Sequence, residues 1–205
     1  KSYVEGALAL GLYCSRLVDQ RDSVGDTAES ARATLLLDIL TPIAKSWPAQ
    51  WCLEANDLAI QVLGGAGYTI DYDVEQHYRD NRLNPIHEGT HGIQGMDLLG
   101  RKVNLDGGSG FQALMDRMRA TVDAASDADL ANAVGTRVYR LVEVTEQLRA
   151  LDDRATALTN SSAYLEAMGD VVVAWLFLDQ LNALQDRTDE LIRPLQFSID
   201  VPRGT

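Results

Sequence analysis

The chain has 205 residues, of which 46% are hydrophobic, enough for one domain with a sizeable core or for two small ones. Its formal net charge is −12 at pH 7 and its basic residues are dispersed, so nucleic acid is excluded as the expected partner. Cys14 and Cys52 fit no metal-binding or redox spacing, which favours a reduced cytoplasmic protein with buried thiols. The longest apolar run, residues 171–178, is too short to cross a bilayer, so no membrane span is expected.

Helical periodicity dominates the first sixty residues, and no segment alternates as a strand would. A first helix is predicted over residues 2–20, with a turn at 22–26. A second is predicted from about Thr27, and Pro42 and Pro48 should end it or kink it. A third should run from about Pro48 to a glycine pair at 64–65, because glycine readily adopts the conformation of a helix C-cap. Apolar residues at four-residue steps indicate the first helix: Val4, Leu8 and Leu12.

A short helix is predicted after the glycine pair, beginning at Asp73 as N-cap with Gln76 completing a capping box. It should end near residue 82, because Pro85 forces the preceding residue to be extended and residues 83–89 then form a loop. Thr90 can cap the next helix, which is predicted to run to about residue 103.

The glycine-rich segment 106–110 is interpreted as a linker or hinge. Three amphipathic stretches follow it, each with one apolar face at 3–4 residue spacing, and we expect these faces to be buried. After Pro194 the periodicity is lost, and the tail is expected to lie over a neighbouring surface or fray. The sequence thus predicts an all-α fold: an antiparallel helical bundle over residues 1–105, then a smaller helical extension over 111–205. The three faces are Phe111, Leu114, Met115, Met118 and Val122; Val134, Val138, Leu141, Thr145 and Leu148; and Tyr164, Met168, Val171, Trp175 and Leu178.

The segment His87-Glu88-Gly89-Thr90-His91 satisfies the zinc-hydrolase pattern H-E-x-x-H. That pattern works when both histidines share one helix face and a third protein ligand completes the site. Here a proline precedes it, a glycine lies inside it, and no third ligand stands out. The histidines are therefore interpreted as polar loop residues beside a site, no metal is expected, and the zinc hydrolase is kept as a rival hypothesis.

Three blocks between residues 61 and 94 are each ambiguous alone. The first is Gln61-Val-Leu-Gly64-Gly65-Ala-Gly67-Tyr68, whose glycines could form a helix cap or let a backbone approach a phosphate. The second is Tyr78-Arg79-Asp80, and the third is Ile86-His87-Glu88-Gly89-Thr90-His91-Gly92-Ile93-Gln94. In this order and spacing they resemble the carboxy-terminal signature of the acyl-CoA dehydrogenase family. Residues 110–205 resemble the extra helical extension of a larger bacterial branch, which includes a dehydrogenase of a methylthiopropionyl thioester.

The resemblance implies that Glu88 is the catalytic base, which removes the α-proton of an acyl-CoA thioester while hydride leaves Cβ for flavin N5. Its backbone N–H would help to bind the thioester carbonyl, and Gly89 would lie against the substrate. The chain begins inside a helical pattern without an initiator Met or a leader, so we expect it to be part of a longer enzyme with upstream domains.

The resemblance also implies FAD as the cofactor. Gln61, Gly64 and Gly65 would contact the FAD of an adjacent subunit, whereas Thr90, His91 and Gly92 would hold the subunit's own FAD, whose diphosphate suits a helix amino terminus. The Arg79-Asp80 pair is expected to be a structural salt bridge.

Three positions depart from the family's pattern. His87 replaces the common aromatic residue, Gly92 replaces a polar one, and Arg101 lies one place beyond a CoA-binding arginine.

The implied partners are an acyl-CoA substrate, an electron-transferring flavoprotein as acceptor and further copies of the chain in a homo-oligomer. Two more hypotheses compete with this one. A non-catalytic helical interaction module is disfavoured by the intact Glu88, and a nucleic-acid-associated relative of the same family is disfavoured by the acidic charge.

Overall fold

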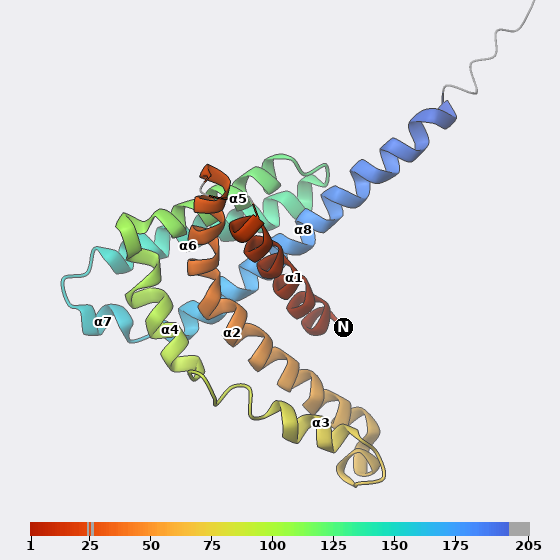
Figure 1. Cartoon of the computed structure of the whole chain (residues 1–205). Helices are drawn as coiled ribbons and strands as arrows, with labels where there is room; N and C mark the ends of the chain where they lie inside the picture. The colour runs from red at the N-terminus through yellow and green to blue at the C-terminus, as the bar shows by residue number, and fades with distance from the viewer. Residues whose placement is uncertain (24, 26, 197–205) are drawn as a thin grey trace, which may run out of the picture.

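The computed structural model describes residues 1–23, 25 and 27–196, and for residues 23, 186 and 188–196 it describes the backbone only. This part of the chain is helical almost throughout and holds no strand, so the all-α prediction is confirmed (Figure 1). The elements are α1 (Ser2–Ser23), α2 (Ala28–Leu63), the 3-10 segment η1 (Gly64–Tyr68), α3 (Val74–Asn81), α4 (His91–Gly100), the 3-10 segment η2 (Lys102–Gly108), α5 (Ser109–Asp123), α6 (Ala128–Arg149), α7 (Arg154–Leu158) and α8 (Ser161–Gln196).

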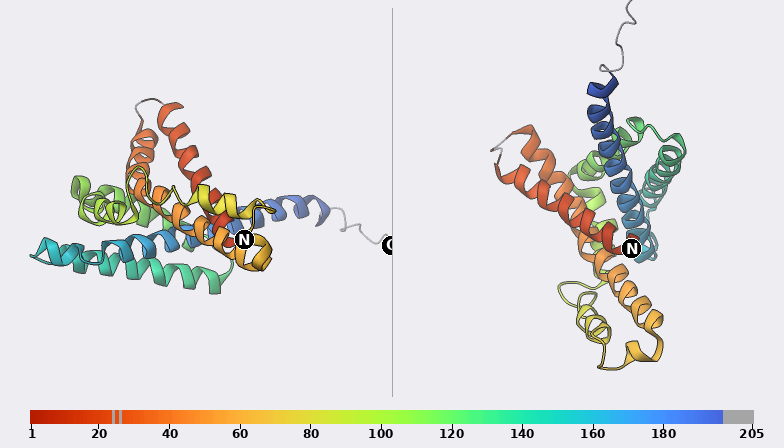
Figure 2. Two further views of the ribbon diagram at one scale, coloured as in Figure 1. Left: turned by 90° about the horizontal axis from the view of Figure 1, so that it is seen from below. Right: turned by 90° about the vertical axis from the view of Figure 1, so that its right-hand side faces the viewer.

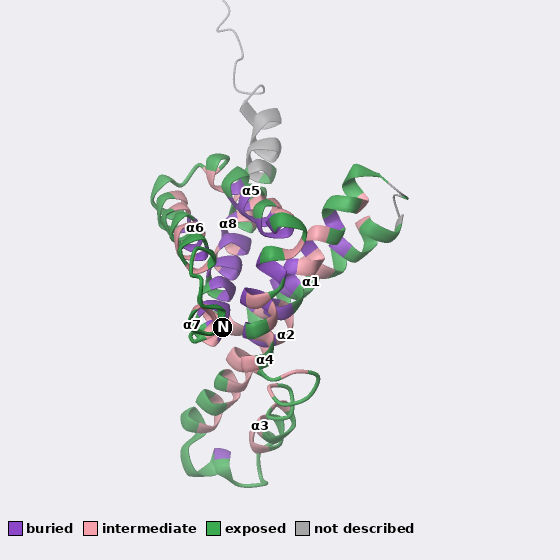
Figure 3. Cartoon of the chain, turned by 90° about the vertical axis from the view of Figure 1, so that its left-hand side faces the viewer, coloured by how far each residue is buried: buried purple, intermediate pink, exposed green. Residues whose placement is uncertain are grey.

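The helices cross around a single core. α1 and α2 pack along each other in opposite directions, α8 runs across both of them, and α6 lies beside α8 (Figures 1 and 2). Buried residues gather where α1, α2, α5 and α8 meet, whereas the end of α2 projects from that centre with α3 folded back along it (Figure 3). The site loop between α3 and α4 therefore lies where the projecting arm joins the core.

The second and third predicted helices are one continuous helix, α2, with Pro42 and Pro48 inside it. A proline within a helix costs about 3 kcal/mol, because it removes a backbone hydrogen bond and crowds the preceding turn. The prediction of a helix end was wrong because burial on either side offsets this cost. Leu36, Ile39, Leu40, Ile43 and Trp47 are all buried, and each such side chain contributes about 1.5–3 kcal/mol.

The apolar stripe that indicated α1 faces outward. Val4, Leu8 and Leu12 are 55%, 61% and 62% exposed. The buried face of α1 carries Ala9, Leu10 and Leu17 together with Gly6, whose missing side chain lets α2 and α8 approach closely. The helix prediction holds, but the exposed stripe leaves an apolar surface of the kind that partners cover.

The three predicted apolar faces of α5, α6 and α8 form the core, with only Val122 and Leu148 partly exposed. One polar residue lies within them, Thr145, which is fully buried. Its hydroxyl donates to the carbonyl of Leu141 at 2.6 Å and is hydrogen-bonded to the hydroxyl of Tyr164 at 2.6 Å. Thr145 is tolerated there because its polar group is satisfied.

The segment between the two helical regions is packed. Within η2, Lys102, Val103 and Gly108 are buried, and the chain turns through left-handed conformations at residues 106–108. The ammonium of Lys102 lies 2.6 Å from a carboxylate oxygen of Asp38 on α2. Because η2 contacts α2, α4 and α5, the helices on its two sides share one core.

Two predicted end signals behave differently in the structure. Asp73 has helical backbone angles and caps nothing with its side chain, and Gln76 instead donates to Asp80 at 2.7 Å, so the capping box was wrong. α8 continues past Pro194 to Gln196, and the remainder of the expected tail lies outside the described residues.

By length and composition alone, Ser161–Gln185 could cross a bilayer. It is the central helix of the core, however, and 61% of its most apolar window is buried inside the structure.

Trp47 lies at the crossing of α1, α2 and α8. A Cβ added to Gly6 of α1 would come within 3.0 Å of the Trp47 ring and 2.6 Å of Val173, and one added to Gly169 of α8 would come within 2.5 Å of the ring. The indole N–H of Trp47 donates to a carboxylate oxygen of Asp170 at 2.8 Å. Two glycines thus make room for one large side chain that joins three helices.

Gly6 and Gly11 offer a matched test of this packing. Gly6→Ala should destabilise the chain by about 1–3 kcal/mol, because the added methyl group overpacks the crossing. Gly11 has open space around its Cβ position, and Gly11→Ala should stabilise the helix by up to about 1 kcal/mol. Urea unfolding followed by circular dichroism measures both, and equal midpoints for the two variants would refute the close packing at Gly6.

Stability should fall at alkaline pH through the half-buried thiol of Cys14 and the buried hydroxyl of Tyr164. Burial raises the pKa of the Cys14 thiol from 9.0 to about 11 and that of the Tyr164 hydroxyl from 10.0 to about 12. Above the ordinary values the unfolded chain binds fewer protons than the folded one, so the stabilisation is complete below about pH 9 and is lost as pH rises through the folded values.

The measurement is the urea midpoint as a function of pH. We expect a decline between about pH 9 and 11 that is shallower in Cys14→Ala. An identical decline in that variant would contradict the assignment to Cys14.

Candidate active site

The segment between α3 and α4 is a chain of tight turns. The amides of Ile86 and His87 donate to the carbonyl of Leu83, at 3.0 and 3.2 Å. Glu88 then adopts a left-handed conformation with φ of 54°, and Gly89 follows with φ of 99°. Such a conformation is uncommon in a residue with a side chain and strained when held, so the surroundings must impose it at Glu88.

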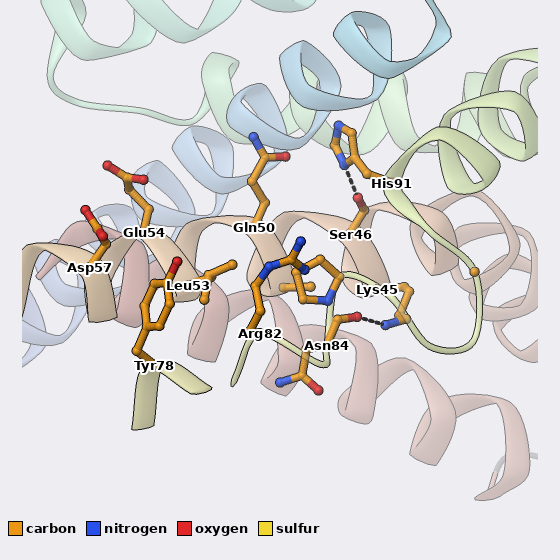
Figure 4. A pocket seen from close by; sticks show the side chains of 13 residues that line it. Lys45, Ser46, Gln50, Leu53, Glu54, Asp57, Tyr78, Arg82, Asn84 and His91 are labelled. Atoms are coloured by element: carbon orange, nitrogen blue, oxygen red, sulfur yellow. Dashed lines mark hydrogen bonds between the residues drawn. The ribbon is translucent and has the colours of Figure 1, made fainter. Parts of the chain in front are cut away.

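Three side chains hold this loop, and Figure 4 shows two of them, Lys45 and Ser46. Lys45 of α2 donates to the carbonyl of Asn84 at 2.6 Å. The buried hydroxyl of Ser46, the next residue of α2, is hydrogen-bonded to Nδ1 of His91 at the start of α4. From within α4, Gln94 donates to the carbonyl of Glu88 at 3.2 Å. The loop is therefore fixed before, at and after Glu88.

The carboxylate of Glu88 has no hydrogen bond or ion pair among the described residues, and the residue is exposed. Its backbone N–H also has no partner within that part of the chain. Glu88 thus offers a free acceptor and a free donor at the same point, while its carbonyl is bound to Gln94.

Gly89 cannot be replaced without strain. A Cβ at this position would lie 2.6 Å from the side-chain amide nitrogen, Nε2, of Gln94, and the positive φ disfavours any side chain. The resemblance assigned Gly89 to substrate contact, which stays a prediction, but the positive φ alone already favours glycine here.

A cavity of about 560 Å³ opens beside the loop, between α2 and α3. Tyr78 and Arg82 reach toward it from the α3 side, and Lys45, Gln50, Glu54 and Asp57 line it from α2 (Figure 4). Gly89 and His91 form the end nearest the candidate base. The walls of the cavity include cations, carboxylates and neutral hydrogen-bonding groups, together with apolar side chains such as Leu53 and Pro85.

The amino terminus of α4 is free to receive an anion. Thr90 is its N-cap residue in backbone conformation, but its side chain caps no amide, so that part of the prediction was wrong. The first turn contains no acidic residue. The first backbone N–H with a partner inside the helix is that of Gln94, which donates to the carbonyl of Thr90. The N–H groups of His91, Gly92 and Ile93 therefore remain as donors at the positive end of the helix dipole.

Gln61, Gly64 and Gly65 lie at the other end of α2, and all three are exposed. Gln61 is 15 residues after Ser46 on the same helix, which corresponds to about 22 Å along the axis. Gly64 has φ of 59° and ends the helix, whereas Gly65 has open space around its Cβ position. The predicted cofactor residues thus fall into two groups that cannot bind the same chemical group.

The zinc-hydrolase hypothesis lacks the geometry that it needs. His87 belongs to the turns before α4 and its Nδ1 lies 3.2 Å from the carbonyl of Leu83, while His91 is engaged by Ser46, so the two histidines do not share one helix. No group of three metal-binding side chains occurs among the residues that the structure describes.

The expected Arg79-Asp80 salt bridge was wrong. The guanidinium of Arg79 lies 3.9 Å from Glu75, one turn earlier on α3, and Asp80 accepts from Gln76. Adjacent residues on a helix point about 100° apart, which separates these two charges.

Sequence reasoning overlooked Lys45 and Ser46, since neither belongs to the quoted blocks. Their contacts join positions about 40 residues apart. No local pattern signals such a pairing.

Two family models match the chain in succession. Residues 9–104 match the acyl-CoA dehydrogenase C-terminal domain, and residues 114–197 match a domain described as acetyl-CoA dehydrogenase C-terminal like. The chain is 28% identical over 195 residues to the broad-specificity linear acyl-CoA dehydrogenase FadE5 of Mycobacterium tuberculosis. It is 30% identical over 188 residues to the 3-methylmercaptopropionyl-CoA dehydrogenase of Ruegeria pomeroyi.

These alignments cover 88% and 85% of this chain but only 32% and 31% of the two relatives, so the chain spans about a third of their length. A solved structure described as the apo form of Bd2924 has the same fold, with a TM-score of 0.64 at 23% identity, over 84% of this chain and 30% of that one. The chain belongs to the acyl-CoA dehydrogenase family, as its C-terminal helical domain followed by the helical extension.

The contact between Gly89 and Gln94 yields a prediction. Gly89→Ala should disrupt the bond from Gln94 to the Glu88 carbonyl and speed amide hydrogen exchange over residues 86–94, because the new methyl group meets the Gln94 amide. Gly107→Ala is the control, since Gly107 also has a positive φ but open space around it. Unchanged exchange over 86–94 in Gly89→Ala would show that Gln94 does not hold the loop.

Proposed function

We propose that this chain supplies the catalytic base of an FAD-dependent acyl-CoA dehydrogenase, with Glu88 removing the α-proton of an acyl-CoA thioester to give a trans-2-enoyl-CoA. The observation that carries the proposal is the state of Glu88. Among the described residues its carboxylate is free and its N–H is free, and a loop held by Lys45, Ser46 and Gln94 fixes its backbone.

The two free groups of Glu88 suit the two demands of α-proton removal. The carboxylate accepts the proton from Cα, and charge then develops on the thioester oxygen. The N–H of Glu88 can donate to that oxygen, and a donor already aimed at the developing charge lowers the barrier. Gly89 keeps the adjoining space free of a side chain, which allows the acyl group to approach.

The residues present fit FAD. The uncapped amides of α4 and the absence of acid in its first turn suit an anionic diphosphate, which Thr90, His91 and Gly92 would hold. Gln61, Gly64 and Gly65 lie at the far end of α2, and we assign them to the FAD of an adjacent subunit in a homo-oligomer. When bound, the flavin supplies the hydride acceptor for Cβ.

The wider assignments rest on the family. An acyl-CoA is the proposed substrate, an electron-transferring flavoprotein the proposed acceptor and the cytoplasm the proposed compartment. The exposed stripe of Val4, Leu8 and Leu12 supports oligomerisation or contact with a further domain, because an apolar surface favours being covered.

Replacing the base tests the mechanism directly. The test uses a longer enzyme, in which this chain is joined to the additional domains that its relatives have. There Glu88→Gln should retain flavin and lower turnover to below about 1% of the parent rate, since an amide cannot accept the α-proton. Glu146→Gln, at an exposed position of α6, is the matched control and should keep the parent rate. Turnover of Glu88→Gln above a few per cent would remove Glu88 from the role.

The division of the cofactor site is a separate prediction. The 205-residue chain alone should fold as helices yet not retain FAD, because it forms only part of the wall around the cofactor. The flavin ring would stay largely in water, and each Å² of apolar surface left exposed loses about 25 cal/mol of binding free energy. The test is the visible absorbance of the chain purified from a flavin-rich host. Stoichiometric flavin in a folded sample would show that this chain carries a complete cofactor site.

A further inference from the structure

The extension touches the site-bearing helix with its backbone. A Cβ added to Gly95 of α4 would lie 2.7 Å from the carbonyl oxygen of Ser161, at the start of α8. The Cβ position of Gly92, one turn earlier, is 3.9 Å from the hydroxyl of Ser162. Contacts between α4 and α8 are among the most extensive in the molecule. The start of α4, which follows the Glu88 loop, is therefore seated on α8.

A second connection runs from α8 through α2. The Trp47 ring packs against α8 at Gly169, which has no side chain to block it. The indole N–H of Trp47 donates to the carboxylate of the next residue, Asp170, at 2.8 Å. Trp47 is only 5% exposed. Its neighbour Ser46 points to a different side of α2, because successive residues are rotated by about 100°. There Ser46 is bonded to His91.

We propose that Gly169 and Asp170 of the extension are positioning residues for the Glu88 loop, acting through Trp47, Ser46 and His91. The inference rests on the proposed function of Glu88. By fixing Trp47, α8 sets the rotation of α2 at this level and so the place of the Ser46 hydroxyl. That hydroxyl in turn sets the first residue of α4, three positions after Glu88. The extension then forms part of the structure that makes the loop productive, although none of its described residues is bonded to the loop's carboxylate.

The charge of Asp170 is not what this role needs. Asp170 is exposed at the surface of α8, and the interaction is a hydrogen bond from a neutral indole. An asparagine can accept the same bond through its side-chain oxygen. Asp170→Asn should therefore behave like the parent. If Asp170 acted only through its negative charge, Asp170→Asn would be as impaired as Asp170→Ala.

The experiment compares hydrogen exchange over residues 86–94 in the 205-residue chain. Asp170→Ala and Trp47→Phe should each speed exchange there by about fivefold, the factor expected for one lost hydrogen bond, and the double variant should add little to either. Asp170→Asn should match the parent. Asp123→Ala is the control, at an exposed carboxylate of α5 that is bonded to no described side chain.

Far-ultraviolet circular dichroism checks that each variant stays folded, and Gly169→Ala provides a second perturbation of the same contact. Parent-like exchange over 86–94 in Asp170→Ala, Trp47→Phe and Gly169→Ala would overturn the proposal. Faster exchange that is spread equally over all helices would overturn it too, since that would show general destabilisation.

The longer enzyme separates this proposal from that for Glu88. There Asp170→Ala should lower kcat about three- to tenfold with KM nearly unchanged, and Asp170→Asn should restore it. If Glu88→Gln stays active while the exchange pattern above is found, the positioning holds and the assignment of Glu88 fails. If Asp170→Asn is as impaired as Asp170→Ala, the hydrogen bond is not the cause and the proposal fails.

Discussion

The packing of one indole between two glycines sets the arrangement of the molecule. Trp47 fills the crossing of α1, α2 and α8, and the chain provides no Cβ at either contact, Gly6 or Gly169. Protein cores are packed as densely as organic crystals, so a side chain of this size fixes the distance and angle between the helices around it. The hydrogen bond to Asp170 adds direction to that contact. The extension and the bundle are therefore joined at the residue next to the one that holds the site loop.

The length of α2 has a functional consequence. Ser46 holds the loop that carries Glu88, Gln61 lies about 22 Å further along the same helix, and Gly64 follows as its C-cap. This helix therefore separates two groups of predicted site residues. We infer that it places the base and the subunit's own cofactor site at one end, and presents a second group of residues to a neighbouring subunit at the other. The proline residues within α2 do not interrupt this, because the surrounding burial holds the helix together.

Much of the fold could be predicted from the sequence, and the failures have definite causes. Apolar spacing located α5, α6 and α8 because their faces are buried within this chain. The same spacing misled at α1, since Val4, Leu8 and Leu12 form a surface that this chain leaves uncovered. Local rules at Pro42, Asp73 and Thr90 describe average preferences, which tertiary packing overrides. The site loop could be found from its motif, but Lys45, Ser46 and Asp170 act across long sequence distances that no local pattern encodes.

The central claim is that the loop presents Glu88 to the α-carbon of an acyl thioester. The most direct measurement is a structure of the longer enzyme with FAD and a non-reactive acyl-CoA analogue. We expect a Glu88 carboxylate oxygen about 3–3.5 Å from Cα, the distance of a reactive pair, with the Glu88 N–H donating to the thioester oxygen and Ser46 still bonded to His91. A different carboxylate beside Cα, or Glu88 directed into solvent while the analogue is seated, would contradict it.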